Sequence, residues 1–136
     1  DLIKPNREEL AEATGRPVLT LGDVIAAAEE LRGRGAGTVL ASLGADGAVL
    51  VDASGATFGS ATVDRPRSAV GAGDAMLAGF LAGGGGGPDA LREALAWGAA
   101  AASLPGSRMP TPDDLDHDAV TLADRIDPDR PLKERS

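Results

Sequence analysis

The chain of 136 residues has no cysteine and no tyrosine, and it has a single histidine. The absence of cysteine excludes disulfides and thiolate metal sites, and it is typical of proteins from a reducing compartment. His117 lies among aspartates near the C-terminus, and without a second histidine or a cysteine it is not expected to bind zinc. The only aromatic residues are Phe58, Phe80 and Trp97, so the core must be built from Ala, Val and Leu.

Long hydrophobic runs and positive charge are also scarce. No apolar stretch reaches the ~20 residues of a membrane span and no signal-peptide pattern opens the sequence, so a soluble, cytoplasmic protein is expected. Lys and Arg number 13 against 21 Asp and Glu, and the net charge of −8 argues against nucleic acid or a membrane as partner. A phosphate-bearing substrate remains compatible, because local N–H donors and a metal outweigh a distant net charge.

The apolar pattern predicts an α/β fold with a mostly parallel sheet. The predicted elements are a strand at residues 2–3, helices at 7–13 and 23–34, strands at 38–43, 48–51 and 56–58, and helices at 75–82 and 88–103. Strand, helix and buried strand in this order indicate a βαβ unit with parallel strands. The short turns around the next two strands predict an antiparallel hairpin at the edge of that sheet.

The stretch from Val63 to Gly83 carries the strongest chemical signal. Its centre, Gly71-Ala72-Gly73-Asp74, precedes a segment that is apolar all round, which predicts a buried helix. Backbone N–H groups at the start of that helix would form an anion site, and Asp74 beside them could take a proton from a hydroxyl. This combination suits phosphoryl transfer. The alternative is ordinary capping, because Gly and Asp are favoured at helix starts for structural reasons alone.

Two further segments allow both a structural and a functional interpretation. Glu9 lies in the first turns of the helix that Asn6 is expected to cap, and it is either a solvated surface residue or part of a site. Residues 96–102 are nearly all Ala and Gly, so another helix or a flat ligand ring could approach them closely. Residues 127–136 are polar and predict a tail.

Three motifs, K-P-N-R-E-E, S-L-G-A-D-G and V-G-A-G-D, occur in this order along the chain. Together they resemble the C-terminal part of the PfkB, or ribokinase-like, family of sugar kinases, and within it the 1-phosphofructokinase and tagatose-6-phosphate kinase branch. The resemblance extends from Leu2 to about Asp127. It implies the C-terminal portion of a three-layer α/β fold, with residues 1–127 as the nucleotide-binding and catalytic-base portion and residues 128–136 as the tail.

The resemblance also implies roles for individual residues. Asp74 is similar to the family's catalytic base, and Gly71, Ala72 and Gly73 to its anion hole. Asn6 and Glu9 match a pattern associated with Mg²⁺ and its water shell. The residues implied to contact ATP are Lys4, Asn6, Ser42, Gly44, Ala45, Asp46, Gly47, Gly98 and Ala102. The tract from Leu104 to Pro110 departs from the family pattern, so purine contacts are not expected from it.

The implied reaction is phosphoryl transfer from ATP to a hydroxyl of a phosphorylated ketohexose, with fructose 1-phosphate as the expected acceptor. The alternatives are a kinase for another sugar or a nucleoside, and a non-catalytic nucleotide-binding module. The first residue is not Met, and such kinases are about twice this length, so the chain is expected to be part of a longer protein. The resemblance implies a homodimer for that full-length protein. The polypeptide of residues 1–136 alone is expected to be inactive.

Overall fold

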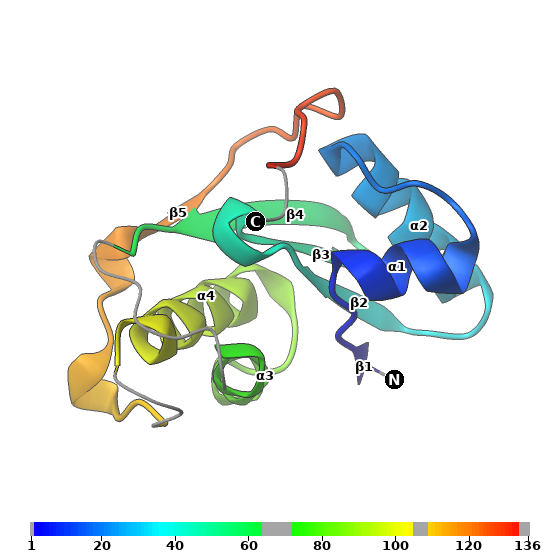
Figure 1. Ribbon diagram of the computed structural model, residues 1–136. Coiled ribbons are helices and arrows are strands. Elements are labelled where there is room, and N and C mark those ends of the chain that lie inside the picture. The colour runs from blue at the N-terminus through cyan, green and yellow to red at the C-terminus, as the bar shows by residue number, and fades with distance from the viewer. Residues whose placement is uncertain (1, 64–71, 105–108, 134–136) are drawn as a thin grey trace. The chain divides into compact units, whose positions relative to one another are not determined.

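The computed structural model describes residues 2–63, 72–104 and 109–133. Contacts divide the chain into two compact units, which we call the first unit (Asp1–Phe58 with Ala123–Ser136) and the second unit (Gly59–Leu122). The elements in chain order are β1 (Leu2–Ile3), α1 (Arg7–Thr14), α2 (Leu21–Gly33), β2 (Thr38–Ser42), η1 (Gly44–Asp46), β3 (Ala48–Asp52), β4 (Gly55–Ala61), α3 (Ala72–Ala82), α4 (Gly87–Ser103), η2 (Pro112–Asp114), η3 (His117–Ala119) and β5 (Val120–Leu122) (Figure 1).

The sheet is mixed, so the prediction of a mostly parallel sheet is wrong. β1 and β2 are parallel as predicted, with Leu2 opposite Thr38. β2 and β3 are antiparallel, with Leu40 opposite Leu50, and β4 and β5 are also antiparallel. The connections explain the difference. The chain between β1 and β2 holds two helices and can return to the same end of the sheet, whereas β2 and β3 are joined by a short turn that only an antiparallel pair allows.

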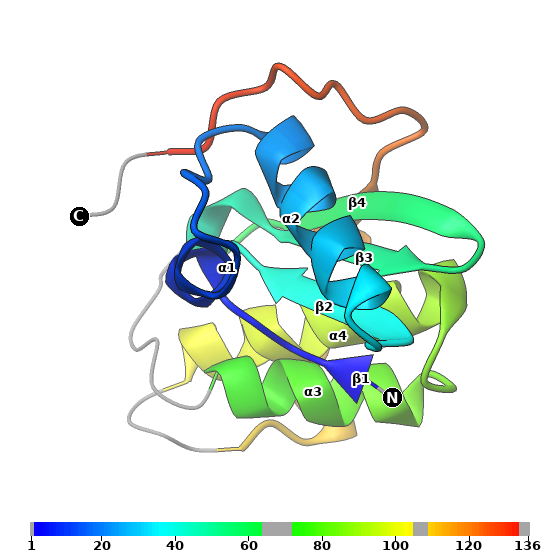
Figure 2. The ribbon, with the colours of Figure 1, turned by 90° about the vertical axis from the view of Figure 1, so that its right-hand side faces the viewer.

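The core of the first unit lies between its two helices and one face of β2 and β3 (Figure 2). Leu10 of α1 and Val24 of α2 are completely buried against alternate strand residues such as Val39 and Val49. Each such side chain contributes about 1.5–3 kcal/mol through removal from water. The apolar spacing of α2 predicted this face, although the helix begins two residues before the predicted start because Thr20 caps it.

The C-terminal segment packs along the start of α2. The N–H of Leu132 donates to the carbonyl of Leu19 at 2.8 Å, and the N–H of Leu21 donates to the carbonyl of Arg130 at 3.0 Å. Leu132 is buried in the core of the first unit. The polar composition of residues 127–136 gave no sign of this anchoring, and the domain limits drawn from the sequence stay a prediction.

The second unit is built on the antiparallel helices α3 and α4, which lie side by side (Figure 1). Phe80 of α3 and Leu91 of α4 are completely buried. The prediction of a buried helix is confirmed for Ala75 and Phe80 and is wrong for Leu81, which is 59% exposed. In the described part of the chain no helix is both long and apolar enough to cross a membrane.

Candidate functional site

The predicted site residues form two groups, one in each unit. The group in the first unit comprises Lys4, Asn6, Glu9, Ser42, Gly44, Ala45, Asp46 and Gly47. The group in the second unit comprises Ala72, Gly73, Asp74, Gly98 and Ala102, and Gly71 lies outside the described residues.

Backbone hydrogen bonding brings the two sequence segments of the first group together. The N–H of Ser42 donates to the carbonyl of Pro5 at 3.0 Å, and Asn6, three residues after β1, forms a parallel bridge with Ser42, the last residue of β2. The carboxyl ends of parallel strands meet at one edge of a sheet, which is where ligands of α/β proteins bind. Lys4, half-buried in the same segment, and the turn after Ser42 therefore belong to one edge.

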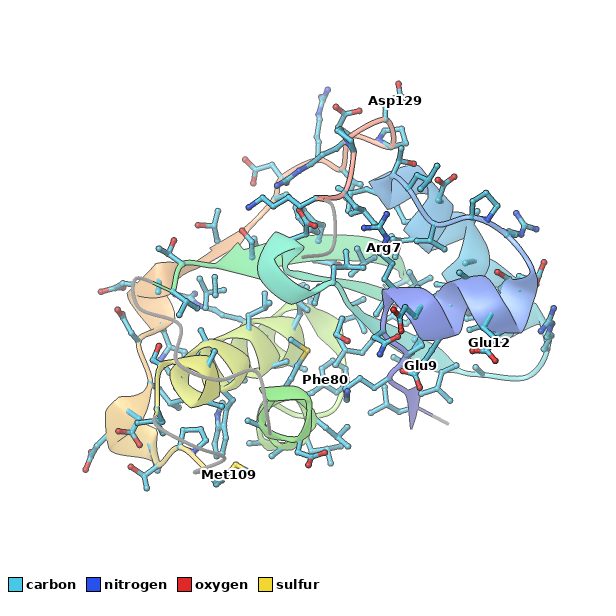
Figure 3. All side chains as sticks on the ribbon, viewed as in Figure 1. Arg7, Glu9, Glu12, Phe80, Met109 and Asp129 are labelled. Atoms are coloured by element: carbon cyan, nitrogen blue, oxygen red, sulfur yellow. The ribbon has the colours of Figure 1, made fainter. Side chains whose placement is uncertain are left out.

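Asn6 and Glu9 form a capping box at the start of α1. The Asn6 side-chain oxygen accepts the N–H of Glu9 at 2.8 Å, and Oε1 of Glu9 accepts the N–H of Asn6 at 2.9 Å. Neither a solvated surface residue nor a site residue, the two interpretations that the sequence allows for Glu9, includes this pairing, although the spacing N-x-x-E is typical of a capping box. Among the residues that the structure describes, only Oε1 of the exposed Glu9 has a hydrogen bond, so Oε2 has room for a metal or its water shell. Figure 3 shows Glu9 and Glu12 on one edge of α1 and Arg7 on another.

The turn between β2 and β3 requires glycine at two positions. Gly44 and Gly47 have φ values of 59° and 108°, which disfavour any other residue. The N–H of Leu43 donates to the carbonyl of Gly47 at 2.8 Å and closes the turn. The S-L-G-A-D-G motif thus has a structural basis for its glycines, whatever ligand it meets.

Asp46, the acidic residue of that turn, is turned into the protein. It is only 6% exposed, and its Oδ2 accepts the main-chain N–H of Lys133 at 2.9 Å. A buried carboxylate needs such a partner because burial removes its hydration. This partner could not be predicted, since it lies 87 residues away in sequence. A contact between Asp46 and a nucleotide stays a prediction.

In the second unit, Asp74 is the third residue of α3, and its side chain is exposed. Ala72 and Gly73 precede it in the first turn, where backbone N–H groups lack partners within the helix and the helix dipole is positive. These N–H groups are the donors that the sequence predicts to bind an anion. Gly98 is buried and Ala102 half-buried on α4.

No group of three or more His, Cys, Asp or Glu side chains that could hold a metal is found among the residues the structure describes. A Mg²⁺ ion that is held mainly by phosphate oxygens and water needs few protein ligands, and Oε2 of Glu9, which has no hydrogen bond among the described residues, is compatible with such an ion. Such coordination is usual for Mg²⁺, which dehydrates reluctantly and keeps several waters.

Comparison with known proteins shows a relationship over most of the chain. The model of the pfkB family carbohydrate kinases matches residues 1–114. The 1-phosphofructokinase of Haloferax volcanii is 46% identical over 117 residues, which cover 84% of this chain and 38% of that protein. Phosphofructokinase-2 from Escherichia coli has a similar structure, with a TM-score of 0.76 and 32% identity over 84% of this chain and 38% of its own.

The fold is that of the ribokinase-like proteins. Ribokinase from Thermotoga maritima is 21% identical with a TM-score of 0.71, over 84% of this chain and 40% of its own. The chain thus spans less than half the length of these relatives.

Proposed function

Because the chain belongs to the pfkB family of carbohydrate kinases, we propose that its protein transfers the γ-phosphoryl group of ATP to a hydroxyl of a phosphorylated ketohexose. The acceptor is fructose 1-phosphate and the product fructose 1,6-bisphosphate. The observation that carries this assignment is the 46% identity to a protein named 1-phosphofructokinase over 84% of this chain. The identity to phosphofructokinase-2 is lower, at 32%.

Residues of the first unit carry the proposed nucleotide and metal contacts. Lys4, Ser42 and the main chain of residues 44–47 contact the nucleotide, and the support for this role is that hydrogen bonding gathers these segments at one sheet edge. Glu9 and Asn6 serve the metal through its water shell, which donates to Oε2 of Glu9, an oxygen with no hydrogen bond among the described residues. Mg²⁺, when bound with ATP, neutralises charge on the β- and γ-phosphates during transfer.

The residues proposed for the chemical step all belong to the second unit. Asp74 accepts the proton of the attacking hydroxyl, and its exposed place in the first turn of α3 supports access to a substrate. The N–H groups of Ala72 and Gly73, together with Gly71, stabilise the charge on the transferred group. Gly98 and Ala102 form the wall for the adenine ring.

The test is a kinase assay on the complete product of the gene, with ATP and with fructose 1-phosphate, fructose 6-phosphate, tagatose 6-phosphate and a nucleoside as acceptors. We expect the highest kcat/KM with fructose 1-phosphate. A higher kcat/KM with another acceptor would mean that this acceptor, and not fructose 1-phosphate, is the substrate of the same phosphoryl transfer. ATP binding without turnover of any acceptor would support the non-catalytic module instead.

A further inference from the structure

The main chain of Lys133 joins two segments that are far apart in sequence. Its N–H donates to Oδ2 of Asp46 at 2.9 Å, and its carbonyl accepts from Nη1 of Arg7 at 2.8 Å. One residue of the C-terminal segment therefore bridges the turn after β2 and the first residue of α1. All three residues belong to the first unit.

The bridge is anchored on both sides. Leu132 is buried in the core, and its N–H donates to the carbonyl of Leu19, so the position of Lys133 is determined by its neighbour. The guanidinium of Arg7 is also engaged at Nε, which donates to the carbonyl of Val18 at 2.7 Å. Two hydrogen bonds from one planar group hold Arg7 in a single orientation.

The residues joined in this way flank the proposed nucleotide contacts. Asp46 lies between Gly44 and Gly47 in the turn, and Arg7 lies between Asn6 and Glu9 in the capping box. A displacement of either segment changes the spacing between the turn and the start of α1. Catalysis of phosphoryl transfer depends on such positioning more than on covalent chemistry.

We propose that Asp46 and Arg7 are positioning residues for ATP, which act through the main chain of Lys133 to fix the turn of residues 44–47 relative to the start of α1. The inference rests on the proposed function, since that function assigns both segments to the nucleotide. It adds that the C-terminal segment forms part of the support of the ATP site.

The experiment compares substitutions in the complete gene product. Asp46→Ala removes the acceptor for Lys133, whereas Asp46→Asn retains an amide oxygen that can accept the same N–H. Asp52→Ala is the matched control, because Asp52 also accepts a main-chain N–H, from Ser54 at 2.9 Å, at the opposite end of β3. Arg7→Lys tests the other side of the bridge, since an ammonium group does not reproduce the two-pronged geometry.

The dissociation constant of ATP is measured by calorimetric titration, with the melting temperature as a record of folding and the KM for ATP and kcat where turnover occurs. We expect Asp46→Ala and Arg7→Lys to weaken ATP binding about five- to tenfold, as loss of one hydrogen bond allows. The KM for ATP should rise more than kcat falls. Asp46→Asn should restore most of the affinity, and Asp52→Ala should leave it unchanged even if it lowers the melting temperature.

The outcomes separate this proposal from the proposed function. Unchanged ATP affinity in Asp46→Ala, or an equal loss in Asp52→Ala, overturns the positioning role and leaves the kinase assignment intact. Weakened ATP binding in a protein that phosphorylates no acceptor overturns the kinase assignment and supports the positioning role. A parent protein that binds no ATP overturns both.

Discussion

Gly79 of α3 lies directly against Trp97 of α4. A Cβ atom at Gly79 would lie 2.6 Å from the Cγ and Cδ1 atoms of the indole ring and 2.6 Å from the carbonyl oxygen of Glu93. Gly83, one turn further along α3, meets Ala90 and Glu93 in a similar way, at 2.9 Å. The glycines at this spacing let the two helices of the second unit approach closely. Packing of helices is thus a sufficient reason for small residues here.

Gly79→Ala is expected to destabilise the protein by about 1–3 kcal/mol, because the added methyl group has no space and the backbone of α4 cannot yield as a flexible side chain would. The measurement is the free energy of unfolding in urea. Gly33→Ala is the control, since Gly33 ends α2 with nothing within 4 Å of a Cβ. A loss of stability in Gly33→Ala as large as in Gly79→Ala would contradict the packing argument.

Thr20→Ala is expected to lower the free energy of unfolding by about 1 kcal/mol, because it removes the side-chain cap of α2. The hydroxyl of Thr20 accepts the N–H of Asp23 at 3.2 Å, and Oδ2 of Asp23 accepts the N–H of Thr20 at 3.1 Å. Thr20→Ser retains the acceptor and should remain near the parent stability. Hydrogen exchange of the first amides of α2 is the measurement, and equal protection in both variants would refute the role of the cap.

The sequence predicted the helices well and the sheet only in part. Asn6 and Gly15 indicate the two ends of α1. The apolar spacing of Val24, Ala27 and Ala28 indicates the buried face of α2. The parallel share of the sheet was overestimated because β2 and β3 are both apolar runs, which is the pattern of parallel as well as of central antiparallel strands. The length of the turn between them was the better evidence.

For the site, the motifs identified the segments and the structure supplied their partners. The parallel pairing of β1 and β2 explains why Asn6 and Ser42 meet, and it follows from the order of the elements. The bond from Lys133 to Asp46 does not follow from any local pattern, since it joins the chain over a long separation. Local periodicity carries no information on such contacts.

Glu9→Gln should separate capping from metal binding. The amide oxygen of Gln can still accept the N–H of Asn6, so the free energy of unfolding should change little. The charge is lost, so the Mg²⁺ concentration for half-maximal activity should rise about tenfold, as is common for residues that support a metal site. The KM for the sugar should change less.

Glu12→Gln is the control for the charge, because Glu12 is exposed on the same helix (Figure 3). An unchanged Mg²⁺ titration in Glu9→Gln would mean that Glu9 serves only the capping box. An equal shift in Glu12→Gln would indicate a general effect of the negative charge on α1.

Asp74→Asn is expected to lower kcat by about 10²–10⁴-fold, because general-base catalysis contributes that much and the amide cannot accept the hydroxyl proton. The affinity for ATP should remain close to that of the parent, since the amide retains the size of the carboxylate.

Asp89→Asn is the matched control: Asp89 is exposed in the first turn of α4, so the same charge is removed from the start of another helix. The measurements are the steady-state kcat and the dissociation constant of ATP for both variants. If Asp74→Asn retained a tenth of the parent turnover, or if Asp89→Asn lost as much, Asp74 would not be the base, and its place in α3 would be explained by the helix dipole alone.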